Sequence, residues 1–591
     1  MVFEAPTGQV YHSRMLTWIA RRLSAVVAFM CVAIVYSALA FACLPTGAQW
    51  SPDTGLRRLQ AQNVRFTPWP ELDLPYPGQW LDPALKFVPL APPVRFQQDG
   101  QIFLTPPAAI AILSQPFIRR WGDAGERVVP VLAGLLSVAL TAFLVRRWTD
   151  RPAWLGVCAA GLATPLLFYS LNFWEHTLAV ALGLGAVALA FGAETPSRGA
   201  LALSGVLTGL AVAAREEMIL LGAITLILML WRGRHELRSA ALWAAAWIAT
   251  LSLWRLTSGD LIPAHLRFNL LTGPLAHAYL LQHPWSGLAD FLFTPQHRAL
   301  SGASFGALIA LWLISRRPLS PLRSVGQALA MTALGVSAAC MAAQAQPGFG
   351  LFGLLSVSPW LVCALASPPA AGASPEREVR RSGEGVPEAG VRALGPGIFL
   401  LYVLSLGLLT PVGPLHSALE WGARLALIVF PLLTPFALRG LHGLWIETRR
   451  SRWAWQPFLA ALGLMGISLG IQARGVAILQ SSLTAGQALR EAILELPERQ
   501  VLTGLLLIPM RVPETYAAKE LYYVETPETA REWLQAAAAH GVTRFAYVGY
   551  RMLDQTGWEA IRPAGKRVLI LSAESLGDGI IVMRLALEPG P

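Results

Sequence analysis

The chain has 591 residues, of which 54% are hydrophobic and only 14% are charged, and its mean hydropathy is +0.49. A soluble protein of this length would need more polar surface to cover its core, so the composition excludes a soluble class. The formal charge of +11 does not indicate a nucleic-acid partner, because nearly all of it is arginine placed in short clusters between apolar runs.

Apolar runs of about 18 to 22 residues recur along the chain, which is the length that an α-helix needs to cross a bilayer. The sequence therefore predicts an all-α polytopic membrane protein with about 13 transmembrane helices, followed by a small α/β domain. The predicted spans lie near residues 23–45, 126–146, 153–171, 175–193, 200–214, 217–231, 239–256, 299–315, 323–343, 349–366, 396–411, 424–440 and 454–472.

The arginine clusters predict how these spans are oriented. Loops that stay in the cytoplasm carry an excess of Arg and Lys. If the N-terminus is cytoplasmic, as Arg14, Arg21 and Arg22 indicate, every cluster falls on the cytoplasmic side. The clusters are Arg146, Arg147 and Arg151; Arg232, Arg234 and Arg238; Arg316, Arg317 and Arg323; and Arg449, Arg450 and Arg452.

Four segments between or after the spans are more polar. We expect residues 1–473 to form the transmembrane domain, which includes a Pro-rich first external loop at 46–125 and a second loop at 257–298. Residues 367–396 are rich in Pro, Gly and charge and predict a flexible cytoplasmic linker. With an odd number of spans, the C-terminal segment 474–591 is extracytoplasmic.

Alternating apolar residues in this last segment predict an α/β domain. The expected helix covers residues 527–541, and the expected strands are 501–508, 544–550, 566–572 and 579–587.

Asp53 is the first candidate functional residue. It follows the first span, in the stretch SPDTGLRRLQ at residues 51–60. The local sequence favours a helix cap, because Asp before a helix satisfies free backbone N–H groups. A carboxylate just beyond a span can equally serve as a catalytic acid or base.

Two further groups of ionisable residues stand where spans begin or end. Glu175 and His176 enter the bilayer face together, which indicates either a functional site or an interfacial anchor beside Trp174. Arg215 shares a tight outer turn with Glu216 and Glu217, a pattern that favours a structural ion pair.

Three cations remain as candidate anion-binding groups. Arg424 stands at an outer span end and suits a phosphate or anionic headgroup, although a snorkelling arginine has the same pattern. Lys86 in the first loop could pair with a phosphate, and a solvated loop lysine is slightly favoured. Arg267 belongs to the second loop. Neither the five cysteines nor the histidines of that loop show metal-ligand spacing, and no nucleotide-binding motif appears.

Several segments occur in a characteristic order. Asp53 is followed by LPYPGQWLDP and DGQIFLTPPAAIAILSQPF, then by ATPLLFYSLNFWEHTLAVAL, GLAVAAREEMILL and WGARLALIVFPLL. In this order, residues 15–470 resemble the integral-membrane glycosyltransferases of the GT-C superfamily. The resemblance is closest to the family 39 and RgtA/B/C/D-like proteins, which are related to protein mannosyltransferases and aminoarabinose transferases.

The resemblance implies transfer of a sugar from a polyprenyl-phosphate donor to a glycan, lipid or protein acceptor at the outer face of a bacterial inner membrane, among membrane lipids. Asp53 would be the catalytic base. The residues that would bind substrate or phosphate are Lys86, Arg267, Arg424, Glu175, His176 and Arg215.

One departure from the family concerns the second acid. Many relatives have Asp-Glu after the first span, whereas this chain has Asp53 followed by Thr54 and Gly55. A second acid would have to come from Asp73, Asp82 or Asp99. We therefore assign no metal ligands, and a requirement for a divalent metal ion is left open.

Two alternatives to an enzyme remain: a transporter or flippase of a lipid-linked substrate, and a degenerate GT-C relative that serves as an assembly subunit. A transporter should place ionisable groups near the middle of the bilayer on broken helices. Here the span centres are almost free of charge and the polar groups gather at one face, which favours the enzyme.

Overall fold

The structure is a computed structural model of the full chain. It describes residues 8–67, 69–91, 94–149, 151–193, 195–231, 237–258, 292–293, 298–345, 353–366, 421, 424, 427–506, 508–550, 557–558, 561, 563–577 and 579–589. Arg267 and the predicted linker at 367–396 lie outside these ranges.

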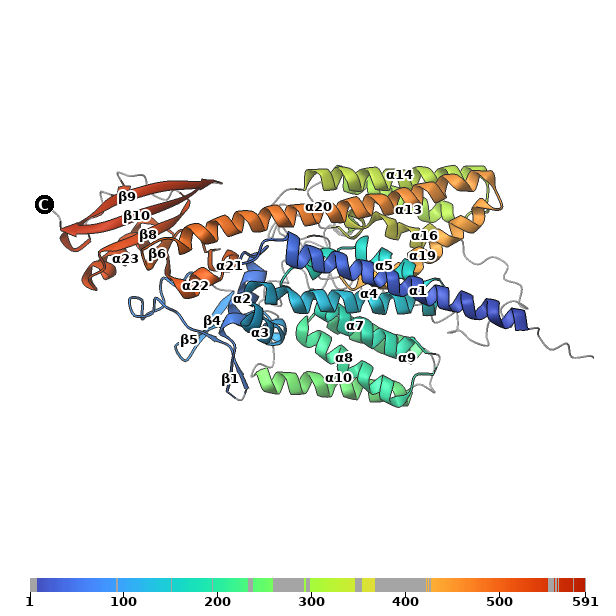
Figure 1. The fold of residues 1–591 in the computed structure, drawn as a ribbon, viewed down its shortest axis with the longest axis horizontal. Coiled ribbons are helices and arrows are strands. Elements are labelled where there is room, and N and C mark those ends of the chain that lie inside the picture. Colours follow the sequence, from blue (N-terminus) through green and yellow to red (C-terminus); the bar gives the residue numbers. More distant parts are fainter. Residues whose placement is uncertain are drawn as a thin grey trace, which may run out of the picture.

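A bundle of helices forms most of the described chain, with a β-rich domain at one end (Figure 1). Six of its helical segments are long and apolar enough to cross a membrane, and four shorter apolar helices accompany them. The protein is therefore embedded in a membrane. The bundle helices are α1 (Gly8–Ala38), α4 (Val128–Thr149), α5 (Ala153–Leu162), α6 (Leu166–Ser170), α7 (His176–Phe191), α8 (Arg198–Ala214), α9 (Met218–Trp231), α10 (Leu237–Ser258), α13 (Arg298–Ser315), α14 (Pro321–Gln344), α19 (Val429–Thr448) and α20 (Trp455–Leu494).

Two predicted spans are not continuous helices. The span at 153–171 breaks before Pro165 into α5 and α6, because a residue that precedes proline avoids helical dihedrals. The span at 349–366 contains three short pieces, α15 (Leu354–Val357), η5 (Pro359–Val362) and α16 (Cys363–Ala366). The run at 396–411 lies outside the described residues. The total of about 13 spans stays a prediction.

The last bundle helix is much longer than its predicted span. We expected that span to end at residue 472 and the polar domain to begin at 474, whereas α20 continues without interruption to Leu494. Residues 473–494 contain no proline and are rich in Ala and Leu, which favour a helix. The first strand of the C-terminal domain begins only at Gln500.

The C-terminal domain is a five-stranded mixed sheet with strand order β7-β6-β8-β10-β9. The strands β6 (Gln500–Thr503), β7 (Glu520–Tyr523) and β8 (Arg544–Tyr550) are parallel. Strand β10 (Ile580–Pro589) is antiparallel to its two neighbours, β8 and β9 (Lys566–Gly577). The predicted helix, α23 (Pro527–Ala539), and three of the four predicted strands are confirmed. The strand predicted at 501–508 ends at Thr503, and Ile508 begins a short helix instead. The prediction missed β7, which is too short to show alternation.

The first loop lies between the bundle and this domain (Figure 1). It follows η1 (Leu39–Cys43) at the end of the first span, begins with α2 (Pro52–Asn63), and leads through α3 (Ala109–Trp121) and η2 (Gly122–Arg127) into α4. Between the helices lie β1 (Arg65–Thr67), β2 (Trp69–Glu71), β3 (Asp73–Leu74), β4 (Arg95–Gln98) and β5 (Gln101–Leu104). The loop packs on the domain: the N–H of Tyr523 donates to the carbonyl oxygen of Phe87 at 2.7 Å, and Trp80 Nε1 donates to Glu520 Oε2 at 2.9 Å.

The described arginine clusters lie at the opposite end of the bundle. Arg146 and Arg147 are in the last turn of α4, Arg316 and Arg317 follow α13, and Arg449 and Arg450 follow α19. A buried ion pair at 2.9 Å between Arg323 at the start of α14 and Glu447 at the end of α19 joins two of these ends. The bundle thus separates an arginine-rich end from the end that carries α2.

Candidate functional site

The start of α2 is fixed by Ser51. Its hydroxyl accepts a hydrogen bond from the N–H of Thr54 at 3.3 Å, and the Thr54 hydroxyl accepts one from the N–H of Ser51 at 3.1 Å. Ser51 is therefore the N-cap, and the interpretation of Asp53 as that cap is wrong. Asp53 sits in the first helical turn, where its charge complements the helix dipole.

The Asp53 carboxylate pairs with Arg424. Arg424 Nη1 donates to Asp53 Oδ2 at 2.7 Å, and the guanidinium lies 5.4 Å from the centre of the Trp174 ring. The Asp53 side chain is 40% exposed and that of Arg424 is 19% exposed. Burial raises the pKa of Asp53, but the charges of Arg424 and Arg57 outweigh burial and lower this pKa to about 2.

Behind this pair lies a buried ionic network. The Glu175 carboxylate has no exposed surface and accepts hydrogen bonds from Arg57 of α2 and, at 2.8 Å, from Arg215 Nη1. Arg215 Nε also donates to Glu217 at 2.8 Å, so the expected ion pair in this turn is confirmed. Partners on both sides offset the cost of burying these charges.

Arg57 connects the network to Asp53. Its Nη1 donates to the backbone carbonyl oxygen of Asp53 at 2.7 Å, while its Nε and Nη2 face Glu175. Glu175 therefore helps to hold the first turn of α2 in place. The sequence places two arginines directly after Asp53, but spacing alone gives them no role.

His176 lies at the edge of the same network. Its Nδ1 is 3.9 Å from Glu217 Oε1, and its ring makes edge contacts with Tyr169 and Trp174 at 5.5 and 5.2 Å. Its Nε2 is buried and has no hydrogen-bond partner among the residues that the structure describes. This nitrogen is available to a group that enters the site.

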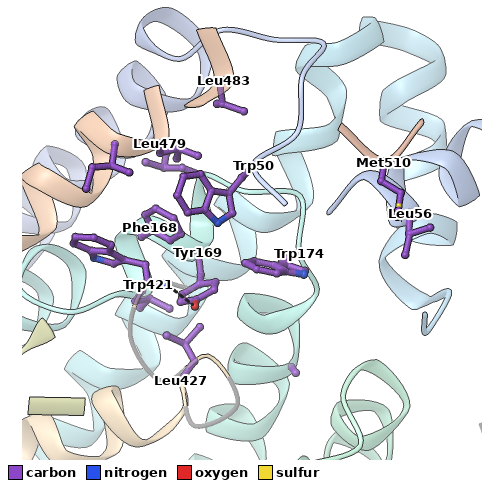
Figure 2. Close-up of a cluster of buried hydrophobic side chains, with 14 of the residues drawn as sticks. Trp50, Leu56, Phe168, Tyr169, Trp174, Trp421, Leu427, Leu479, Leu483 and Met510 are labelled. Atoms are coloured by element: carbon purple, nitrogen blue, oxygen red, sulfur yellow. Dashed lines mark hydrogen bonds between the residues drawn. The ribbon is translucent and has the colours of Figure 1, made fainter. Parts of the chain in front are cut away.

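An aromatic cluster packs beside the network (Figure 2). Trp50 meets Phe168 edge-on at 5.4 Å, and Phe168 stacks on Trp421 at 5.8 Å. The backbone N–H of Trp421 donates to the hydroxyl of Tyr169 at 3.3 Å (Figure 2). A Cβ at Gly475 of α20 would lie 2.5 Å from the Trp421 ring, so glycine makes room for it. These rings exclude water and strengthen the neighbouring charge pairs.

A second ionic network lies on another face of α2, and the sequence analysis did not anticipate it. Arg58 contacts Asp123 at 2.7 Å and Glu126 at 3.4 Å. Gln49 Nε2 also donates to Glu126, at 2.9 Å. Consecutive arginines thus fix α2 to two different parts of the protein.

Among the described residues, the structure brings together five of the seven predicted site residues, namely Asp53, Glu175, His176, Arg215 and Arg424. Lys86 instead pairs with Glu532 of α23 at an exposed position. The aspartates expected to supply a second acid also lie elsewhere: Asp73 pairs with Arg65 at 2.6 Å, Asp82 accepts backbone N–H groups of Lys86 and Phe87, and Asp99 is exposed in a turn. The acids that share the ionic network behind Asp53 are Glu175 and Glu217.

Within the described ranges, no group of three or more His, Cys, Asp or Glu residues is arranged to hold a metal ion.

No family model and no curated protein sequence matches the chain. Its fold is similar to ArnT from Cupriavidus metallidurans in the apo state, with a TM-score of 0.44 and 12% identity over 95% of this chain and 97% of that chain. It is also similar to the Archaeoglobus fulgidus oligosaccharyltransferase in the apo form, with a TM-score of 0.43 and 11% identity over 88% and 69% of the two chains.

A third match is ArnT bound to undecaprenyl phosphate, with a TM-score of 0.38 and 14% identity over 95% and 97% of the chains. All three TM-scores lie below 0.5, so the case for a function rests on the residues of this chain.

Proposed function

We propose that this chain is a glycosyltransferase of the GT-C type that transfers a sugar from a polyprenyl-phosphate donor to a hydroxyl or amine acceptor. The observation that carries the proposal is the accessible Asp53–Arg424 pair, backed by a buried, charge-compensated network at the start of α2. The membrane-embedded bundle and the sequence resemblance add support, because a lipid-linked donor must reach its enzyme from within the bilayer.

Asp53 would act as the general base. The acceptor oxygen or nitrogen attacks the anomeric carbon, the bond from that carbon to the phosphate oxygen breaks, and the proton of the acceptor passes to the Asp53 carboxylate. A single displacement of this kind inverts the configuration of the sugar. Asp53 is suited to the role because its side chain is 40% exposed, whereas that of Glu175 is fully buried.

Arg424 would bind the leaving phosphate. A guanidinium can bond two phosphate oxygens at once. The aromatic rings around Arg424 lower the local dielectric constant, which strengthens its attraction to the phosphate. Arg424 is already bonded to Asp53, so the donor phosphate competes with the carboxylate for the same cation. Donor binding therefore weakens the Asp53–Arg424 bond and raises the pKa of Asp53, which makes the carboxylate a stronger base when the acceptor is to be deprotonated.

The buried members of the network would act mainly through position and charge. Arg57 and Arg215 hold Glu175, and Arg57 holds the first turn of α2. The unpartnered Nε2 of His176 would hydrogen-bond a sugar hydroxyl or a phosphate oxygen. Lys86, which pairs with Glu532, and Arg267 stay predictions as phosphate partners.

We extend the proposal to the cellular location. The arginine-rich end of the bundle would face the cytoplasm, together with the N-terminus, and the C-terminal domain would face the periplasm. The membrane would be the inner membrane of a bacterium, as the resemblance implies.

Sugar transfer by the reconstituted Asp53→Asn variant tests the proposal. The substitution preserves size and removes the proton acceptor, and we expect transfer from polyprenyl-phosphate donors to fall at least about 10²-fold. Asp99→Asn is the matched control, because Asp99 belongs to the same loop, is exposed and has a positive φ of 52° that asparagine tolerates well. This control should transfer as the wild type does, and all three proteins should unfold at similar temperatures.

Two results would contradict the proposal. Nearly normal transfer by Asp53→Asn would show that Asp53 is not the base. A wild-type protein that transfers nothing from any polyprenyl-phosphate sugar, but binds or moves such lipids, would support the transporter or the assembly subunit instead.

A further inference from the structure

The C-terminal domain reaches the candidate site through a short connection between two parallel strands. This connection joins β6 to β7 and contains α21 (Ile508–Arg511) and α22 (Glu514–Ala518). It leaves the sheet and packs against the start of α2 (Figure 1). The sequence predicts that residues 474–591 form a domain separate from the transmembrane domain, and nothing in it indicates this contact with α2.

Arg511 forms a bridge between α2 and α20. Its Nη1 donates to the carbonyl oxygen of Trp50 at 3.0 Å. Its Nη2 donates to the carbonyl oxygen and the hydroxyl of Ser482 in α20 at 2.9 and 2.7 Å. The backbone carbonyl oxygen of Arg511 also accepts the N–H of Gln49 at 2.9 Å. Arg511 therefore bonds both Gln49 and Trp50, the two residues directly before the N-cap Ser51.

Direct packing reinforces this bridge. A Cβ at Gly55 would overlap the backbone carbonyl group of Met510, so α2 and α21 approach each other as closely as their backbones allow. Leu56 and Met510 are both buried and lie side by side (Figure 2). Glycine stands two residues after Asp53 because any larger residue would push the helix away.

The bridge and the packing contact lie on either side of Asp53. Gln49 and Trp50 precede it, Gly55 and Leu56 follow it, and all four contact α21. We infer that Arg511 is a positioning residue for the Asp53 carboxylate, and that the C-terminal domain is a structural part of the transferase site rather than a separate binding module. The expected effect on sugar transfer rests on the proposed role of Asp53, whereas the support that Arg511 gives to α2 does not.

Two substitutions disturb the contact from opposite sides. Arg511→Ala removes the bridge, and Gly55→Ala inserts a methyl group between α2 and α21. Arg511→Lys keeps the charge but replaces the two-nitrogen guanidinium fork, which bonds Trp50 through Nη1 and Ser482 through Nη2, by a single ammonium group. Misplacement of a catalytic group by about 1 Å can cost 10²-fold in rate. We therefore expect kcat to fall by about 10- to 100-fold for the first two variants and less for Arg511→Lys, while KM for the donor changes less than about twofold.

The matched controls come from the same elements. Arg584→Ala removes another arginine of the C-terminal domain, which bonds Glu498 at 2.9 Å and does not touch α2. Gly466→Ala adds a methyl group to a glycine of α20 that has open space around it. Both controls should keep the wild-type kcat.

Hydrogen exchange on the full-length protein separates this inference from the proposed function. Arg511→Ala should speed exchange selectively in residues 49–63, whether or not the protein transfers sugar, and Arg584→Ala should not. If transfer fails in every protein but exchange responds as expected, the proposed function fails and the positioning contact stands. If Arg511→Ala matches Arg584→Ala in both exchange and kcat, the inference is wrong.

Discussion

At the scale of single residues, the site shows how a low-polarity region holds many charges. Arg57, Arg215 and Arg424 face Asp53, Glu175 and Glu217, so three positive charges meet three negative ones. Removing one member of such a buried set lowers the free energy of unfolding by more than the whole set contributes to it, because the partner's charge is left buried without compensation. Asp53 and Arg424 differ from the buried members because water reaches both side chains.

The dependence of transfer on pH should reveal the Asp53–Arg424 pair. Arg424 lowers the pKa of Asp53, so Arg424→Gln should raise this pKa toward its ordinary value near 4. A carboxylate must be ionised to act as a base, and kcat/KM reports the free enzyme. The acid limb of kcat/KM should therefore move to higher pH in Arg424→Gln, by about one to two units.

The control for this measurement is Arg65→Gln, which removes an exposed first-loop arginine paired with Asp73 and should leave the acid limb in place. In the wild type, the acid limb of kcat should lie at higher pH than that of kcat/KM, because the donor phosphate draws Arg424 away from Asp53. If the acid limbs of kcat and kcat/KM lie at the same pH, the donor phosphate does not draw Arg424 away from Asp53.

At the scale of elements, α20 is the feature that joins the two halves of the molecule. Its 40 residues span about 60 Å, twice the thickness of the hydrocarbon core. The second half of the helix therefore projects beyond the membrane and carries Ser482 to the bridge with Arg511. A continuous helix transmits position over this length only if its hydrogen-bond ladder is intact.

We expect a proline in this projecting half to separate the domain from the site. Gln487 is half-buried, and Glu491 is the hydrogen-bond partner of its side chain among the described residues. Gln487→Pro should cost about 3 kcal/mol or more by breaking the helix, and sugar transfer should fall with it. Gln487→Ala should change stability by less than about 0.5 kcal/mol. Thermal unfolding and transfer assays of both variants would check this, and equal behaviour would contradict it.

At the scale of the whole molecule, charge is sorted along the bundle. The end near α2 holds paired acids and bases, and the opposite end carries the arginine clusters at the ends of α4, α13 and α19. Such a distribution fixes the orientation of a membrane protein during insertion. It predicts that the candidate site faces away from the cytoplasm.

Cysteine labelling tests this orientation. Asp99 and Arg450 are both exposed. Asp99 lies in the turn between β4 and β5 of the first loop, and Arg450 follows α19 at the arginine-rich end of the bundle. In a background without the native cysteines, a membrane-impermeant maleimide should label Asp99→Cys on intact spheroplasts, and should label Arg450→Cys only after permeabilisation. The reverse pattern would show that the site faces the cytoplasm.

Local patterns in the sequence predicted much of the fold. The strands from Arg544 to Tyr550 and from Ile580 to Pro589 were expected because their apolar residues alternate, and α23 because of its amphipathic period. The break before Pro165 and the extension of α20 were missed because hydropathy marks apolar length and not helix continuity.

The candidate site was predicted only in part. Charged residues at span ends could be recognised individually, and five of them do meet. Their pairing could not be predicted, because Arg424 is 371 positions from Asp53 and only the tertiary fold brings them together. Arg57 was overlooked because an arginine on a short external helix is usually solvated. Lys86 was a candidate phosphate partner, with a solvated loop lysine slightly favoured. Its exposed pair with Glu532 could not be predicted, because the two residues are 446 positions apart in the sequence.

The bridge made by Arg511 has a consequence for biosynthesis. It joins Trp50, which lies shortly after the first long apolar helix of the chain, to a residue 461 positions later. The helices that precede Arg511 can therefore be translated and inserted while α2 still lacks its support from α21. In the enzyme we propose, such an unfinished chain would transfer sugar at least about 10-fold more slowly than the full chain, so truncated products would consume little lipid-linked sugar.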